Sequence, residues 1–163
     1  MPSKIVEECV DRLVNSGLQI VFAESVTAGR IASEFSLVME SGSILLGSVV
    51  SYDPRVKSQI LKVPQQLLEK HTPESAEVTR AMANGLRDLI ESDIYVAVTG
   101  LASPGGSETP EKPIGTAFIH IVMPDQEVAH REVFDGEPEE VVLKIIDKTS
   151  QLITQHIPTL KNL

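Results

Sequence analysis

Cysteine and aromatic residues are scarce in this chain. Its 163 residues include one cysteine, Cys9, no tryptophan, and aromatic side chains make up 4%. One cysteine excludes a disulfide within the chain, and the four histidines are not spaced as metal ligands. Cys9 falls on an apolar helical stripe, so we expect it in the core. The sequence therefore predicts no disulfide framework and no metal site, and it calls for no other cofactor.

Positive charge is also in short supply. The chain has 14 Lys and Arg residues against 23 Asp and Glu residues, and its formal net charge is −9. Nucleic-acid backbones are bound mainly by excess Lys and Arg, so this balance argues against a nucleic-acid partner. It does not exclude a small anionic ligand, because a local cluster of backbone N–H groups can hold a phosphate.

Long hydrophobic runs are missing as well. No stretch approaches the roughly 20 apolar residues that a membrane-spanning helix needs, and the N-terminus lacks a basic region followed by an apolar run. We therefore expect a cytoplasmic protein without a membrane partner. Hydrophobic residues make up 42% of the chain, which is ordinary for a globular protein, and its length fits one domain over residues 1–163.

The hydrophobic pattern predicts helices interleaved with strands. The expected strands are 18–23, 44–51, 94–99, 114–123 and 127–134, the last two forming a hairpin. Helices are expected between Ser3 and Gly17, after Thr27, from Asp53, from Pro64, over 75–91 and over 138–157. In the helix over 75–91, the residues expected to face inward are Val78, Met82, Leu86 and Leu89. This order predicts a three-layer α/β/α sandwich with a mixed sheet.

The first candidate site segment is residues 23–29, where the first strand meets a helix. Its sequence, A-E-S-V-T-A-G, places small and hydroxyl residues at that junction. Free N–H groups at a helix N-terminus favour negative charge, either a phosphate or a developing oxyanion. Ser25 or Thr27 could instead be a simple helix N-cap. Taken alone, the segment favours the cap.

The second segment, residues 51–57, combines a tyrosine and a lysine. If Asp53 is the N-cap of the next helix, Tyr52 and Lys57 occupy the N′ and N4 positions, which meet in a hydrophobic staple. A phenol and an amine placed together can activate a serine hydroxyl as a nucleophile. The alternative is a solvated helix lysine and a tyrosine that packs through its ring.

The third segment is a loop of 14 residues, 100–113, rich in glycine and proline. Loops of this length inside a compact domain are more often functional than shorter ones. Glycines let the backbone approach a ligand closely. Neither a Walker lysine motif nor GxGxxG is present, so composition favours a binding loop and a plain surface connection about equally.

Together the three segments resemble the CinA C-terminal domain family, whose stand-alone members are nicotinamide-nucleotide amidases. The family pattern is A-E-S-C-T-G-G after a strand, then T-Y-x-x-x-x-K, then G-I-A-G-P-G-G and E-K-P-x-G-T. The matching segments here are 23–29, 51–57, 100–106 and 111–116, and the similarity extends from about residue 5 to 157. The resemblance implies a sheet that is mostly parallel, in an anticodon-binding-domain-like arrangement.

The resemblance also implies an activity and a site. The family reaction is hydrolysis of the carboxamide of nicotinamide mononucleotide, without a metal, and family members suggest a homodimer. The family's catalytic serine, tyrosine and lysine fall on Ser25, Tyr52 and Lys57, and N–H groups after Ser25 are candidates for the oxyanion hole. By motif position, the substrate-binding candidates are Glu24, Val26, Thr27, Gly29, Arg30, Gly100, Ala102, Gly105, Gly106, Lys112, Gly115 and Thr116.

Several positions depart from the family pattern. The family cysteine is Val26, one glycine of A-E-S-C-T-G-G is replaced by Ala28, and one glycine of G-I-A-G-P-G-G is replaced by Ser103. The family segment H-G-A-V-S is H-T-P-E-S here, beginning at His71. None of these removes a catalytic group, but Ala28 and Ser103 add bulk where backbone approaches a ligand. Two other functions therefore stay open, a non-catalytic nucleotide-binding or regulatory module and a role in DNA uptake. The net charge argues against direct DNA contact.

Overall fold

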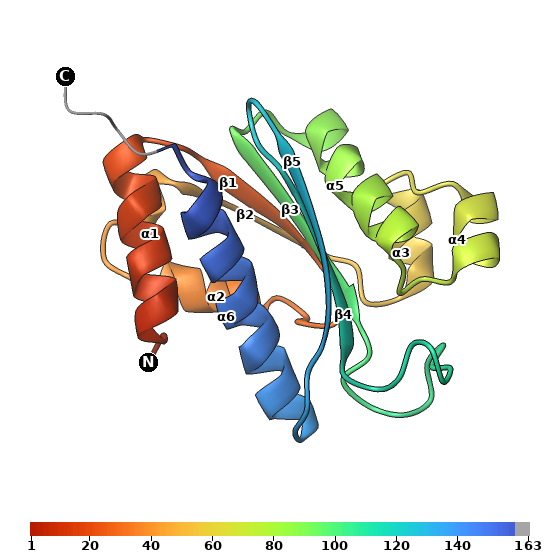
Figure 1. Cartoon of the computed structure of the whole chain (residues 1–163). Coiled ribbons are helices and arrows are strands. Elements are labelled where there is room, and N and C mark those ends of the chain that lie inside the picture. Colours follow the sequence, from red (N-terminus) through yellow and green to blue (C-terminus); the bar gives the residue numbers. More distant parts are fainter. Residues whose placement is uncertain (159–163) are drawn as a thin grey trace.

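The computed structural model describes residues 1–158 and consists of a five-stranded sheet with helices on both faces (Figure 1). The strands are β1 (Ile20–Glu24), β2 (Leu45–Val50), β3 (Ile94–Gly100), β4 (Thr116–Val122) and β5 (Glu127–Val133). The helices are α1 (Lys4–Ser16), α2 (Arg30–Ser36), α3 (Pro54–Gln59), α4 (Gln65–His71), α5 (Ala76–Leu89) and α6 (Pro138–His156). All the predicted strands and helices are present, with boundaries shifted by up to about three residues.

Local chemistry sets several helix ends. Ser3 caps α1 by accepting a hydrogen bond from the Val6 N–H, and Gly17 ends the helix with a φ of 66°, in the left-handed region. Asp53 caps α3 and is followed by Pro54 at the first helical position, as the sequence predicts. One short element was not predicted, the 3₁₀ helix η1 (Ser41–Ser43).

The sheet is mixed, with strand order β2-β1-β3-β4-β5. The β1 strand pairs in parallel with β2 and with β3, whereas β4 pairs antiparallel with both β3 and β5. Four strands therefore run in one direction and β4 alone runs against them. This confirms the predicted mixed, mostly parallel sheet, and it brings the carboxyl ends of β1, β2 and β3 to one edge.

Each face of the sheet carries its own hydrophobic core, which makes the fold a three-layer sandwich (Figure 1). Helices α1, α2 and α6 cover one face, with Cys9 buried there as expected. Helices α3, α4 and α5 cover the other. The prediction for Leu89 is wrong: it is 49% exposed, because α5 ends at this residue and Leu86 is the last large apolar side chain buried from that helix.

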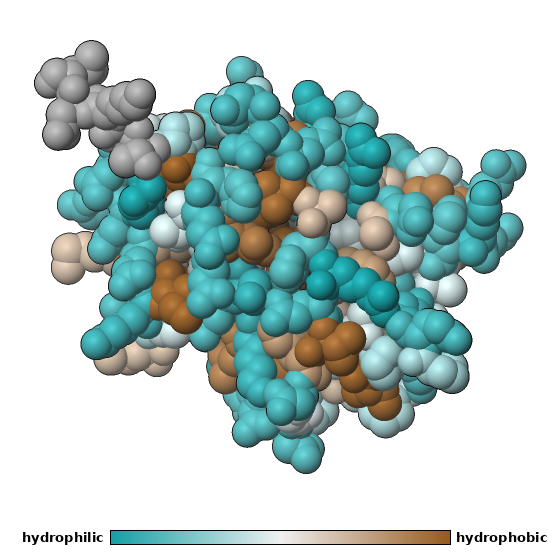
Figure 2. Space-filling view, viewed as in Figure 1, coloured by the Kyte–Doolittle hydropathy of each residue, from teal (hydrophilic) through white to brown (hydrophobic). Residues whose placement is uncertain are grey.

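On the face of the molecule drawn in Figure 2, hydrophilic residues cover most of the surface and hydrophobic patches are small and separated. This agrees with the burial of most large apolar side chains in the two cores. Within residues 1–158, no helix is both long enough and apolar enough to cross a membrane.

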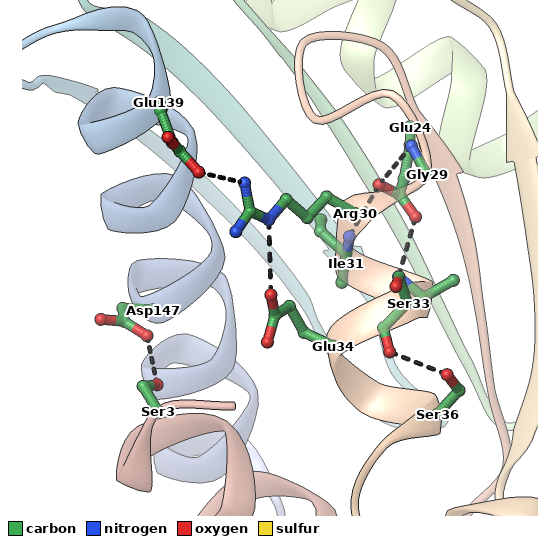
Figure 3. A network of polar contacts seen from close by, with 11 residues as sticks. Ser3, Glu24, Gly29, Arg30, Ile31, Ser33, Glu34, Ser36, Glu139 and Asp147 are labelled. Atoms are coloured by element: carbon green, nitrogen blue, oxygen red, sulfur yellow. Dashed lines mark hydrogen bonds and ion pairs between the residues drawn. The ribbon is translucent and has the colours of Figure 1, made fainter. Parts of the chain in front are cut away.

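A buried carboxylate joins β1 to α2 (Figure 3). The Glu24 side chain is fully buried at the end of β1. Its Oε2 accepts hydrogen bonds from the Thr27 hydroxyl at 2.7 Å and from the Gly29 and Ile31 N–H groups at 3.0 Å. Its Oε1 accepts from the Ala32 N–H and the Ser48 hydroxyl. The carboxylate thus occupies the N-terminus of α2, where negative charge is favoured.

We expect Glu24→Gln to lower the free energy of unfolding by about 2 kcal/mol, because an amide nitrogen would face N–H donors and leave at least one of them buried without an acceptor. Urea unfolding followed by circular dichroism measures the change. The matched control is Glu139→Gln, which removes the same charge from the exposed end of the neighbouring ion pair with Arg30 and should cost less than about 1 kcal/mol. Equal losses in the two variants would contradict the structural role of Glu24.

Candidate active site

A pocket of about 230 Å³ opens at the carboxyl ends of the three parallel strands. Ser25 follows β1, Tyr52 follows β2, and the segment 100–106 begins at the end of β3; all three contribute to its lining. Ligands of open α/β sheets bind at this edge of the strands. The topology therefore brings together three segments that are far apart in the sequence.

Ser25 is held at the start of the turn between β1 and α2. Its N–H donates to the Val98 carbonyl of β3 at 3.0 Å. On the other side, the Ser51 N–H donates to the Glu24 carbonyl at 2.7 Å. The residue is 5% exposed, yet it lines the pocket. These backbone bonds hold the chain at Ser25 between the two neighbouring strands, as the positioning of a nucleophile requires.

Lys57 reaches Ser25 from α3. Its Nζ lies 2.8 Å from the Ser25 Oγ and donates to the Ser51 carbonyl at 2.7 Å. The side chain is 1% exposed, and this burial lowers the pKa of the Lys57 amine from 10.5 to about 8. A neutral amine within hydrogen-bond distance of a hydroxyl can accept its proton. The pair can therefore generate a serine nucleophile.

Two backbone donors beside Ser25 are available. The Ala28 N–H donates to the Ser25 carbonyl and the Arg30 N–H to the Thr27 carbonyl, while the Glu24 carboxylate takes others in the turn. The N–H groups of Val26 and Thr27 donate to no acceptor among residues 1–158. Adjacent N–H groups directly after a nucleophile can stabilise the oxyanion of a tetrahedral intermediate. Ser25 is not the α2 N-cap, a position taken by Gly29.

Tyr52 lines the same pocket, but the structure shows no hydrogen bond between it and Lys57 within residues 1–158. Tyr52 is 68% exposed, whereas Lys57 is buried. No hydrogen bond between described residues joins the Tyr52 hydroxyl to Lys57 or Ser25. The difference arises because the lysine amine turns inward to the Ser51 carbonyl and Ser25, leaving the tyrosine ring at the pocket wall.

The glycine-rich loop forms another wall of the pocket. Of its predicted substrate-binding residues, Gly100, Ala102, Gly105 and Gly106 line the pocket, together with Val26 of the first segment. Gly105 has a φ of 99° and donates its N–H to Glu108 Oε1 at 2.9 Å. This bond lowers the pKa of the Glu108 carboxyl. The loop is therefore stabilised by the side chain of its own Glu108, and its glycines line the pocket.

Four predicted binding residues, three in the first segment and Arg30 directly after it, lie outside the pocket lining. Glu24, Thr27 and Gly29 form the buried network at the start of α2, so the carboxylate cannot contact a ligand in the pocket. Arg30 pairs with Glu34 at 3.3 Å and with Glu139 at 2.9 Å (Figure 3). Its guanidinium thus points to α6.

Lys112, Gly115 and Thr116 hold the far end of the loop and do not line the pocket either. The Lys112 Nζ donates to the Thr72 hydroxyl at 2.6 Å and to the Ser107 hydroxyl at 2.8 Å. Burial lowers the pKa of this lysine. Gly115 has a φ of 95°, and a Cβ there would lie 1.9 Å from the Phe134 carbonyl oxygen. Thr116 is buried and donates to the Pro113 carbonyl.

Glu74 is a pocket residue that sequence reasoning missed. It precedes α5, and its Oε2 accepts a hydrogen bond from the Ser107 hydroxyl at 2.5 Å. Its negative charge raises the pKa of Lys57, against the larger lowering by burial. The only signal in the sequence was that T-P-E-S departs from the family pattern after His71. In the described part of the chain, no cluster of three or more His, Cys, Asp or Glu side chains could hold a metal ion.

Comparison with curated proteins gives relatives over most of the chain. A CinA-like protein from Citrifermentans bemidjiense is 40% identical over 139 residues, which cover 83% of this chain and 33% of that protein. A putative competence-damage inducible protein from Desulforudis audaxviator is 32% identical over 143 residues, covering 88% of this chain and 34% of that protein. The chain thus spans about a third of the length of these relatives.

Solved structures of similar size have the same fold. A competence damage-inducible protein A from Klebsiella pneumoniae superposes with a TM-score of 0.90 at 25% identity, covering 97% of this chain and 98% of that chain. A CinA superfamily protein from Escherichia coli gives a TM-score of 0.85 at 27% identity, covering 93% of this chain and 88% of that chain. The sequence model of the CinA C-terminal domain matches residues 2–157. This chain belongs to the CinA C-terminal domain family.

Proposed function

We propose that the protein is an amidase that hydrolyses the carboxamide of nicotinamide mononucleotide to nicotinate mononucleotide and ammonia, within pyridine-nucleotide recycling. The observation that carries the proposal is the 2.8 Å contact between Ser25 Oγ and Lys57 Nζ beside the pocket. A serine next to a buried lysine of lowered pKa is a nucleophile paired with its base. The substrate comes from the family resemblance.

In the first half of the proposed reaction, neutral Lys57 accepts the Ser25 proton as Oγ attacks the amide carbon. The new C–O bond converts the carbonyl oxygen to an oxyanion, which we assign to the Val26 and Thr27 N–H groups because neither donates to an acceptor within residues 1–158. The Lys57 ammonium then gives its proton to the amide nitrogen. The C–N bond breaks, ammonia leaves, and an acyl ester on Ser25 remains.

In the second half, water attacks the acyl carbon while Lys57 accepts a proton from it. The tetrahedral intermediate collapses, the ester C–O bond breaks, and Lys57 returns the proton to Ser25 Oγ. The Ser51 carbonyl accepts a hydrogen bond from Lys57 at 2.7 Å and keeps the amine aimed at Ser25 in both halves. Among the described residues, no hydrogen bond joins Tyr52 to Lys57 or Ser25, so we assign Tyr52 to the wall that faces the substrate ring.

Three other expectations stay predictions. They are that the protein acts as a homodimer, that it is cytoplasmic, and that it requires no cofactor. A non-catalytic nucleotide-binding module is the competing function. It would bind nicotinamide mononucleotide without releasing ammonia, so the experiment below separates the two.

Ammonia release from nicotinamide mononucleotide is the direct test. We expect the wild-type chain to release ammonia, and Ser25→Ala and Lys57→Ala each to lose roughly 10²-fold or more in kcat, because base-assisted attack alone contributes about that factor. The control variants, Ser36→Ala and Lys70→Ala, remove the same groups from exposed positions and should retain the wild-type rate.

The outcomes separate the parts of the proposal. Absence of ammonia at saturating substrate from a folded wild-type chain would refute the amidase. Activity that survives Ser25→Ala would keep the amidase and remove Ser25 as its nucleophile. A Lys57→Ala variant with the full rate would remove the lysine from the mechanism.

The pKa of Lys57 sets the expected pH dependence. The base must be neutral to accept the Ser25 proton, so kcat/KM should rise about tenfold per pH unit below the pKa and level off above about 8. Because the Glu74 charge raises this pKa, Glu74→Gln should move the rising limb to lower pH. Initial rates of ammonia release, measured across pH for the wild type and for Glu74→Gln, give the rising limb of each protein. A profile that is flat between about pH 6 and 9 would contradict Lys57 as the base.

A further inference from the structure

The pocket carries one charged lining residue, Glu74, within the part of the chain that the structure describes. The rest of the lining is Ser25, Tyr52, small residues and the glycine-rich loop. Glu74 lies close enough to the catalytic pair for its charge to act on Lys57. A ligand positioned for attack by Ser25 therefore experiences the field of this carboxylate.

The Glu74 carboxylate is not neutralised by contact with a cation. Among residues 1–158, no salt bridge within 4.0 Å includes Glu74. The nearby Lys112 ammonium donates to the Glu74 backbone carbonyl and to the Ser107 hydroxyl, and makes no bond to the carboxylate. Ser107 donates a neutral hydrogen bond to Oε2. The side chain is thus held in place by a neutral donor, and the charge of Glu74 acts on the nearby Lys112 without a direct ion pair.

One oxygen of this carboxylate is available to a ligand. Oε1 of Glu74 accepts no hydrogen bond from the described residues, whereas Oε2 is bonded to Ser107. Within residues 1–158, the one buried side-chain polar atom without a partner is Oε2 of Glu108. Oε1 of Glu74 is therefore open to solvent, and Glu74 lines the pocket.

An aromatic face accompanies the carboxylate. Tyr52 lines the pocket and is 68% exposed. Aromatic faces attract cations, and planar rings stack on them. Lys57 does not line the pocket, and in the form that can accept the Ser25 proton it is neutral. In the reactive state, the pocket therefore presents a negative charge and an aromatic wall, with no opposing positive charge on its lining.

We propose that Glu74, together with the Tyr52 ring, makes the pocket selective for a carboxamide carried by a cationic aromatic ring, an N-substituted pyridinium, over the same amide on a neutral ring. The inference rests on the proposed amidase function and names the residue that selects within its substrate class. Glu74 acts here as a specificity determinant, because its charge complements the ring and takes no proton in the reaction.

Binding without turnover tests this selectivity. In the Ser25→Ala background, calorimetry at about pH 9, where Lys57 is mostly neutral, compares 1-methylnicotinamide with nicotinamide, which differ by an N-methyl group and one positive charge. We expect the cation to bind about tenfold more tightly, in line with a partly desolvated charge pair and a cation–π contact. Adding Glu74→Gln should remove most of this preference while leaving the affinity for nicotinamide within about threefold.

The matched control is Glu77→Gln, which removes the same charge three residues away on the exposed side of α5, and should keep the tenfold ratio. Ser107→Ala removes the hydrogen bond to Glu74 but not the charge, and should also keep a preference for the cation. An unchanged ratio in a folded Glu74→Gln variant would overturn the proposal. So would a pocket that bound neither compound at millimolar concentration.

These outcomes are separable from those of the proposed function. Normal ammonia release with a ratio insensitive to Glu74 would overturn the selectivity and keep the amidase. A ratio that depends on Glu74, in a chain that releases no ammonia, would keep the selectivity of the pocket and overturn the amidase.

Discussion

The buried carboxylate of Glu24 is the interaction on which the geometry of the β1–α2 turn depends. Five hydrogen bonds converge on it, three of them from backbone N–H groups of Gly29, Ile31 and Ala32. A buried charge is tolerated only when its bonds are satisfied, and here they are supplied by the turn, by the first residues of α2 and by Ser48 of β2. The turn can therefore satisfy the carboxylate in few other shapes, and within residues 1–158 the N–H groups of Val26 and Thr27 remain beside Ser25 without an acceptor.

The second constraint is the burial of Lys57. An ammonium that is 1% exposed loses hydration, and the Ser51 carbonyl and the Ser25 hydroxyl replace only part of it. The same cost that lowers the pKa to about 8 brings the neutral amine within reach of physiological pH. The charges of Glu74 and Asp53 raise this pKa, but by less than burial lowers it. The burial of Lys57 therefore has two consequences: it costs free energy, and it lowers the pKa to a value that suits the proposed base.

The sequence predicts the fold better than it predicts the site. Periodicity and caps identify the elements because local residues such as Ser3, Gly17 and Asp53 determine them. The buried hydrogen-bond network of Glu24 could not be predicted in this way, since a carboxylate at the end of a strand is equally consistent with a ligand contact. The meeting of Ser25 and Lys57 depends on the order of β1 and β2 in the sheet, which spacing does not encode. The family resemblance supplied that pairing, and it missed Glu74.

The proposed selectivity links the substrate to the base. A positive ring beside Glu74 would offset the negative charge that raises the pKa of Lys57. In the proposed complex, the amine therefore loses the field that favours its protonated form, and a larger fraction is neutral at a given pH. The same cationic ring withdraws electrons from its amide and makes the carbonyl carbon more electrophilic. An amide on a neutral ring provides neither effect. In the proposal, Glu74 therefore discriminates between the two rings in binding. The positive charge of the bound ring then favours both the neutral form of Lys57 and attack on the amide carbon.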